Sequence, residues 1–107
     1  MGVVLETSSG AVVGCATLHP TSGGPNGWPG VWLFDHFTHP NFQNQSGALL
    51  EATTWPTGKI ISYVDTAAPD KAAVLEAREF EREGTLKSFL RLADAAHDVW
   101  LYGKTVY

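Results

Sequence analysis

Apolar residues cluster in short runs that predict a β-rich chain. Runs at residues 3–6 and 11–18, separated by a Ser- and Gly-containing turn, predict a β-hairpin. The next run, at 31–38, is apolar on both faces, which is typical of a central strand that is covered on both sides. The segment between these strands, at 21–30, is rich in Gly, Pro, Ser and Asn and is expected to be a loop.

Two segments have the pattern of short helices. The first, over 48–53, begins near Ser46, which can cap it, and ends before Pro56, because a proline biases the preceding residue away from helix. The second, over 71–78, follows Pro69 and places Ala and Val side chains on one face.

The remaining apolar runs complete a mixed sheet. Strands are predicted at 59–64, at 80–92 with a bend at Gly84, and at 98–106. The element order is therefore β-β-β-α-β-α-β-β, in which each helix is expected to join two neighbouring parallel strands by a right-handed crossover. The predicted fold class is α/β (α+β), a mixed and mostly antiparallel central sheet with two helices, in a single domain over residues 1–107.

Composition narrows the function classes. The chain has 44% hydrophobic and 11% aromatic residues, which favours a packed fold over disorder. A net charge of −4 argues against a nucleic-acid partner, and the apolar runs are all far shorter than the roughly 20 residues that cross a bilayer, so no membrane partner is expected. The only cysteine, Cys15, cannot form an intrachain disulfide, which fits a cytoplasmic location, and no signal peptide is recognised.

The segment from the strand at 31–38 to the helix at 48–53 suggests a ligand. Pro40 stops the strand, and an amide-rich turn at 41–47 leads into the helix. This order aims the free N–H groups of a helix N-terminus at one spot, which suits a phosphate or diphosphate. The alternative is an ordinary polar turn with a serine cap.

Asp35 and His36 interrupt an otherwise apolar strand. A buried carboxylate or imidazole has a displaced pKa and can take a proton from an amine. The alternative is a hydrogen-bonded polar pair in the core. No metal site is expected, because His36 and His39 point to opposite faces of a strand.

Several segments resemble one family. Residues 37–42 with 47–52 resemble a central strand, a His-Pro corner and the helix that receives a diphosphate. Residues 70–86 and 98–103 resemble the helix, long strand and last strand that close the same domain. Together they resemble the GNAT superfamily of N-acetyltransferases, which use acetyl-CoA.

The chain departs from the family pattern in three places. Ser46 stands for the first glycine of the turn motif Q/R-x-x-G-x-G/A, which Gln43 can begin. Leu75 stands where many members carry a tyrosine that acts as a general acid, and Glu79 replaces a glycine. The chain also starts directly in a hairpin, where the family has a further strand and a helix pair. The resemblance is therefore to a truncated or degenerate member.

The resemblance implies transfer of an acetyl group from acetyl-CoA, as cosubstrate, to a small-molecule or peptide amine. Asp35, His36 or a water would take the proton of the amine, and strand N–H groups would polarise the carbonyl. The residues implied to bind acetyl-CoA lie at the strand end and in the turn: Phe37, Thr38, His39, Gln43, Asn44, Gln45, Ser46 and Gly47.

A catalytically inactive GNAT-like binding or dimerisation module is the alternative function. The replaced glycine and Leu75 favour it, whereas the strand, turn and helix order favours the enzyme. An incomplete sheet leaves strand edges uncovered, and a symmetric partner would cover them, so a homodimer is expected.

Overall fold

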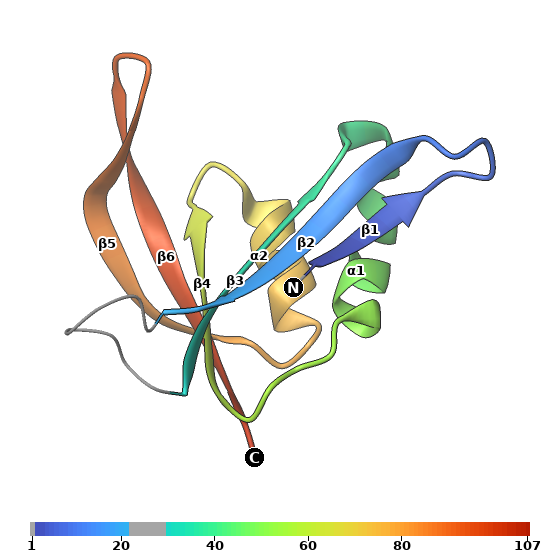
Figure 1. Cartoon of the computed structure of the whole chain (residues 1–107). Coiled ribbons are helices and arrows are strands. Elements are labelled where there is room, and N and C mark those ends of the chain that lie inside the picture. Colours follow the sequence, from blue (N-terminus) through green and yellow to red (C-terminus); the bar gives the residue numbers. More distant parts are fainter. Residues whose placement is uncertain (1, 22–29) are drawn as a thin grey trace.

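The chain forms one six-stranded sheet in the order β1-β2-β3-β4-β6-β5 (Figure 1). The computed structural model describes residues 2–21 and 30–107, so most of the predicted loop lies outside the described residues. The strands are β1 (Gly2–Glu6), β2 (Val12–Pro20), β3 (Val31–Thr38), β4 (Gly58–Asp65), β5 (Glu81–Leu92) and β6 (Ala95–Val106). The helices are the 3₁₀ helix η1 (Pro40–Gln45), α1 (Ser46–Ala52) and α2 (Pro69–Glu76).

The mixed, mostly antiparallel α+β fold is confirmed, but one predicted neighbour is wrong. β3 and β4 are parallel neighbours, as expected for the crossover through α1. β5 does not pair with β4, because β6 lies between them and pairs with both. The reason is burial: β6 contributes Val99, Tyr102 and Gly103 to the interior, whereas most of β5 is exposed and suits the edge of the sheet. The predicted bend at Gly84 coincides with a register shift between Arg82 and Gly84.

Both helices pack on the same face of the sheet. Alternate strand residues bury against them, because successive side chains of a strand point to opposite faces. The buried core joins strand side chains to α1 and α2 through Ala16, Leu18, Phe34, Ile60, Val64, Leu49, Leu50, Ala72 and Leu75. The Phe34 ring lies 5.0 Å from Trp55 and 6.1 Å from Phe80 between ring centroids, which fixes β3 against this layer.

The opposite face of the sheet carries exposed aromatic side chains. Phe37 is 64% exposed, Phe89 59% and Tyr63 40%. The Tyr63 and Phe89 rings stack at a centroid distance of 5.7 Å with an interplanar angle of 13°.

Among the described residues, none of the helices has the length and apolar character that a membrane-spanning segment requires.

β3 and β4 run together only at their starts. Within the described chain, the paired residues are limited to Val31–Leu33 of β3 opposite Lys59–Ile61 of β4. Beyond them β3 remains paired with β2 as far as Thr38, and β4 remains paired with β6 as far as Asp65. The sheet therefore opens between β3 and β4, and Figure 1 shows the two halves fanning apart.

A glycine pair fixes the start of the short pairing between the two strands. Lys59 donates its N–H to the Gly30 carbonyl at 2.8 Å. Gly58 has φ +132°, and a Cβ atom there would lie 2.2 Å from the Gly30 oxygen. Only glycine allows this approach, because an L side chain would clash and would strain the backbone.

We expect Gly58→Ala to destabilise the fold. The backbone conformation alone costs about 1–3 kcal/mol, and the clash with Gly30 adds to it. Gly84→Ala is the matched control, because a Cβ there meets nothing within 4 Å. Urea denaturation measures both, and equal stability of the two variants would contradict the role assigned to Gly58.

Candidate functional site

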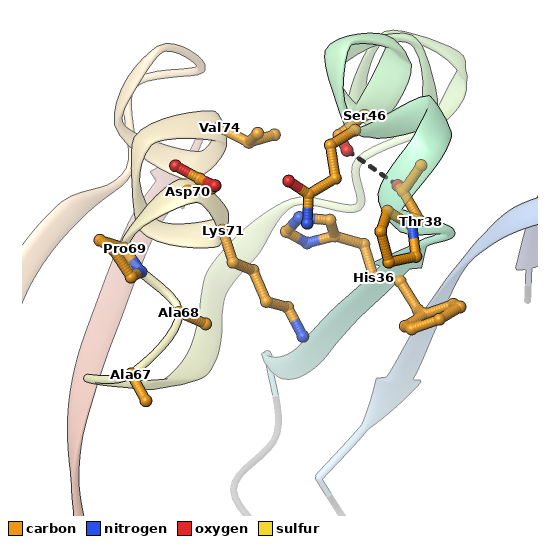
Figure 2. Close-up of a pocket in the computed structure, with 12 residues that line it drawn as sticks. His36, Thr38, Ser46, Ala67, Ala68, Pro69, Asp70, Lys71 and Val74 are labelled. Atoms are coloured by element: carbon orange, nitrogen blue, oxygen red, sulfur yellow. Dashed lines mark hydrogen bonds between the residues drawn. The ribbon is translucent and has the colours of Figure 1, made fainter.

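A cleft occupies the opening between the diverging strands (Figure 2). Its volume is about 340 Å³. One wall comes from the end of β3 and the turn that follows, and consists of His36, Phe37, Thr38, Pro40, Gln43 and Ser46. The other comes from the end of β4 and the first turns of α2, and consists of Ala67, Ala68, Pro69, Asp70, Lys71 and Val74.

The main chain of β3 presents hydrogen-bonding groups to this opening. Thr21 N–H donates to the Val31 carbonyl at 2.9 Å, and His39 N–H donates to the Val13 carbonyl at 2.7 Å, so odd-numbered residues of β3 bond to β2. The N–H and C=O groups of even-numbered residues therefore point toward β4. His36 and Thr38 lie beyond the last residue paired with β4, so their main-chain groups face the cleft.

His36 places a buried imidazole at the same opening. The residue is 4% exposed, and its Nδ1 atom has no hydrogen-bond partner among the described residues. Figure 2 shows the ring pointing into the space between the two walls. Burial, helped by the Lys71 ammonium, lowers the pKa of His36 to about 4, and the Asp35 carboxylate offsets part of this shift. The imidazole is therefore neutral near pH 7 and is a weak base, suited to accepting or donating a hydrogen bond.

Asp35 connects the two walls. Its Oδ1 atom accepts the N–H of His36 at 2.8 Å and the ammonium of Lys71 at 2.6 Å. The Asp35 side chain is 63% exposed and that of Lys71 is 28% exposed. The predicted hydrogen-bonded pair of Asp35 and His36 in the core is therefore wrong. Asp35 bonds to the main-chain N–H of His36 and to Lys71 of α2, and it does so at the surface.

The second wall is held in place by Asp65 at the end of β4. Its carboxylate accepts the N–H of Ala67 at 2.9 Å and contacts His97 Nδ1 at 2.8 Å. The hydrogen bond from Ala67, followed by that to His97, holds the pKa of Asp65 below its ordinary value. These contacts fix the short connection that leads into α2.

The expectation of open main-chain donors after Pro40 is wrong for three residues. Asn41 N–H bonds to His39 Nδ1 at 3.2 Å, and Phe42 N–H bonds to the His39 carbonyl at 2.8 Å. Ser46 N–H bonds to the Gln43 carbonyl. The physical reason is that Pro40 begins a 3₁₀ helix that runs directly into α1, so the donors are used within the turn.

Ser46 does not cap the helix as predicted. It is the first residue of α1, whose N-cap is Gln45. The buried Ser46 hydroxyl instead donates to Thr38 Oγ1 at 2.8 Å and ties the turn to β3 (Figure 2). A Cβ atom at Gly47 would lie 3.1 Å from Arg78 Nη2, so this glycine accommodates an arginine that also pairs with Glu51 at 2.8 Å.

The predicted site residues divide into two groups. The cleft lining includes His36, Phe37, Thr38, Gln43 and Ser46. It does not include Asp35, His39, Asn44, Gln45 or Gly47. In the described part of the chain, no three His, Cys, Asp or Glu side chains gather as a metal site.

Sequence reasoning missed the second wall, of which Lys71 is the charged member. A signal for it was present: the carboxyl ends of two adjacent parallel strands lie at the same edge of a sheet. The segments that follow β3 and β4 should therefore meet across the edge between them.

Comparison with known proteins gives a result only at the level of structure. No protein-family model and no curated protein matches the sequence. A ribosomal-protein-alanine N-acetyltransferase from Brucella melitensis has a TM-score of 0.80 at 18% identity, over 98% of this chain and 68% of that one. A GNAT superfamily phosphinothricin acetyltransferase from Sinorhizobium meliloti, solved in complex with acetyl-CoA, has a TM-score of 0.78 at 19% identity, over 98% and 60%.

An N-acetyltransferase from Staphylococcus aureus Mu50 matches similarly, with a TM-score of 0.75 at 19% identity over 95% of this chain and 65% of that one. The chain has the GNAT fold. The fold expected from the resemblance is thereby confirmed. The chain spans 60–68% of the length of these three GNAT-fold proteins.

We expect the low pKa of His36 to appear in the pH dependence of stability. The unfolded chain takes up the proton near pH 6.5 and the folded chain only near pH 4, so stability falls as pH decreases through this interval. The loss between pH 7 and pH 4 is about 3 kcal/mol for this group. Urea denaturation of His36→Gln at both pH values should show this loss of unfolding free energy to be absent. The control His19→Gln, at an exposed position on β2, should still show it. An NMR titration that finds His36 protonated at pH 6 would contradict the assignment.

Proposed function

We propose that the protein binds acetyl-CoA in the cleft and transfers the acetyl group to an amine. The observation that carries this proposal is the opening between β3 and β4, which exposes one edge of β3 within a GNAT fold. Proteins named N-acetyltransferases share that fold, and one of them was solved with acetyl-CoA.

The residues of the first wall suit an extended ligand that carries amides. A chain with amide groups can pair with a free strand edge as an additional strand does. In this proposal the main-chain carbonyl of His36 and the main-chain groups of Thr38 receive the amides of the pantetheine arm, beside Phe37. The unpartnered Nδ1 of His36 offers a further hydrogen bond.

The diphosphate is proposed to lie toward the turn, near Gln43 and Ser46, which line the cleft. Because the N–H groups of Asn41, Phe42 and Ser46 are used internally, the turn provides fewer donors than the sequence suggested. His39, Asn44, Gln45 and Gly47 stay predictions from the resemblance.

Acetyl-CoA would supply the acetyl group as a thioester. In the overall reaction the amine nitrogen bonds to the acetyl carbon, the carbon–sulfur bond breaks, and CoA leaves as a thiol with the proton that the nitrogen loses. A pKa of about 4 makes His36 a poor acceptor for that proton, so we assign His36 to binding. Asp35 or a water as the proton acceptor stays a prediction from the sequence. Positioning would supply most of the rate.

The acceptor is proposed to be a small-molecule or peptide amine. The similar structures are named for different acceptors, such as a ribosomal-protein alanine and phosphinothricin, so the fold does not select one. A cytoplasmic location stays a prediction from the single cysteine.

Binding can be tested by filling the cleft. We expect Ala68→Trp, in the second wall, to weaken acetyl-CoA binding by more than about tenfold, because the indole would occupy ligand space. Ala73→Trp, at an exposed position of α2 outside the lining, should bind as the unsubstituted protein does. Calorimetry measures both. No heat from the unsubstituted protein at millimolar acetyl-CoA would contradict the proposal.

A second candidate is an inactive module that dimerises through the uncovered face of the sheet. The exposed rings of Phe37, Tyr63 and Phe89 on that face favour it, since such rings are enriched in interfaces. A homodimer is also compatible with the enzyme.

Light scattering tests the dimer. We expect the mass of two chains, and we expect Phe89→Glu to shift the protein toward one chain. Tyr107→Glu, at a fully exposed terminal position, is the control and should leave the mass unchanged. A single chain at every concentration would exclude the homodimer.

A further inference from the structure

Two hydrogen-bond donors from opposite walls of the cleft converge on one oxygen atom. His36 N–H, from β3, and Lys71 Nζ, from α2, both donate to Asp35 Oδ1, at 2.8 Å and 2.6 Å. A main-chain N–H and an ammonium directed at one anionic oxygen have the composition of an oxyanion hole.

The place of this oxygen is defined by the strand geometry. The N–H of His36 is on the edge of β3 that faces β4, beyond the last paired residue. Lys71 extends from the first turn of α2 on the other side of the opening (Figure 2). Both residues line the cleft, and Asp35 Oδ1 lies between their two donors although Asp35 is not itself part of the lining.

The resemblance already implies that a strand N–H, here that of His36, polarises the carbonyl oxygen of the acyl group. We propose that Lys71 is a second donor to this oxygen from the opposite wall, and that Asp35 Oδ1 occupies the position when no ligand is bound. This inference rests on the proposed function, and it adds Lys71 as a catalytic residue. A carbonyl oxygen that displaces Asp35 meets the same two donors, and their attraction strengthens as the oxygen gains negative charge.

The exposure of the pair supports displacement. The Asp35 side chain is 63% exposed, and an ion pair as open as this one contributes little to stability. Asp35 can therefore turn into solvent at low cost. Lys71 is 28% exposed and has the cleft on one side, so its ammonium stays near the site after Asp35 leaves.

The competing role for Lys71 is to bind a phosphate. The phosphate role and the acyl-oxygen role differ in which part of acetyl-CoA contacts Lys71. A phosphate contact affects CoA and acetyl-CoA equally, because both carry the same phosphates. A contact to the acyl oxygen affects acetyl-CoA alone.

The test combines calorimetry with infrared spectra of acetyl-CoA labelled with ¹³C at the thioester carbonyl. We expect binding to lower the carbonyl stretching frequency and Lys71→Met to remove most of that shift. We also expect Lys71→Met to weaken acetyl-CoA about tenfold more than CoA, the scale of a charged hydrogen bond. Asp35→Ala should tighten acetyl-CoA and leave CoA unchanged, since no carboxylate must be displaced.

Lys59→Met is the matched control, because Lys59 also pairs with one carboxylate, that of Glu83, but lies outside the cleft lining. It should keep the full infrared shift. An unchanged shift in Lys71→Met, or equal weakening of CoA and acetyl-CoA, would overturn the acyl-oxygen site while leaving acetyl-CoA binding in place. Absence of acetyl-CoA binding to the unsubstituted protein would overturn the proposed function and this site together.

Discussion

The short parallel pairing of β3 with β4 is the constraint on which the site depends. The two strands are joined at Val31–Leu33 and Lys59–Ile61 and are then held by different partners, β2 and β6. The contact of Gly58 with the Gly30 carbonyl fixes the start of the paired segment, and the strands diverge at its other end. Because two pairs of strands pull apart while each stays fully paired on its outer side, the opening costs few main-chain hydrogen bonds. It leaves the main-chain groups of His36 and Thr38 facing the cleft, where the N–H of His36 bonds to Asp35 Oδ1.

The fold followed from local patterns, whereas the position of β6 in the sheet did not. Apolar periodicity and proline positions act over a few residues, so the strands, both helices and the bend at Gly84 could be predicted. The insertion of β6 between β4 and β5 depends on which strand has the more apolar surface in the assembled sheet. The use of main-chain donors by η1 depends on a helical turn that joins α1 without a break. Neither the position of β6 nor this use of the donors can be predicted from a short stretch of sequence.

Asp35 and His36 show how much of the site the residue types alone could predict. Two polar residues in an apolar strand indicated a site, and both are at the cleft or beside it. As neighbours in a strand they point to opposite faces, so His36 is buried and Asp35 is exposed. The partner that organises them, Lys71, is 36 positions from Asp35 along the chain and could not be paired with it from the sequence. The role proposed for Lys71 and the assignment of His36 to binding therefore come from the structure, whereas the location and the strand N–H donor came from the sequence.

The uncovered aromatic face also has a consequence for how the molecule responds to ionic strength. Each chain carries a net charge of −4, which makes two copies repel at long range. Added salt shortens the reach of that repulsion to about 10 Å at 0.1 M and less above it. The attraction between exposed rings such as Phe89 and Tyr63 is not weakened in this way. In the proposed dimer, concentrated electrolyte therefore strengthens the association, the opposite of its effect on assemblies held by ion pairs.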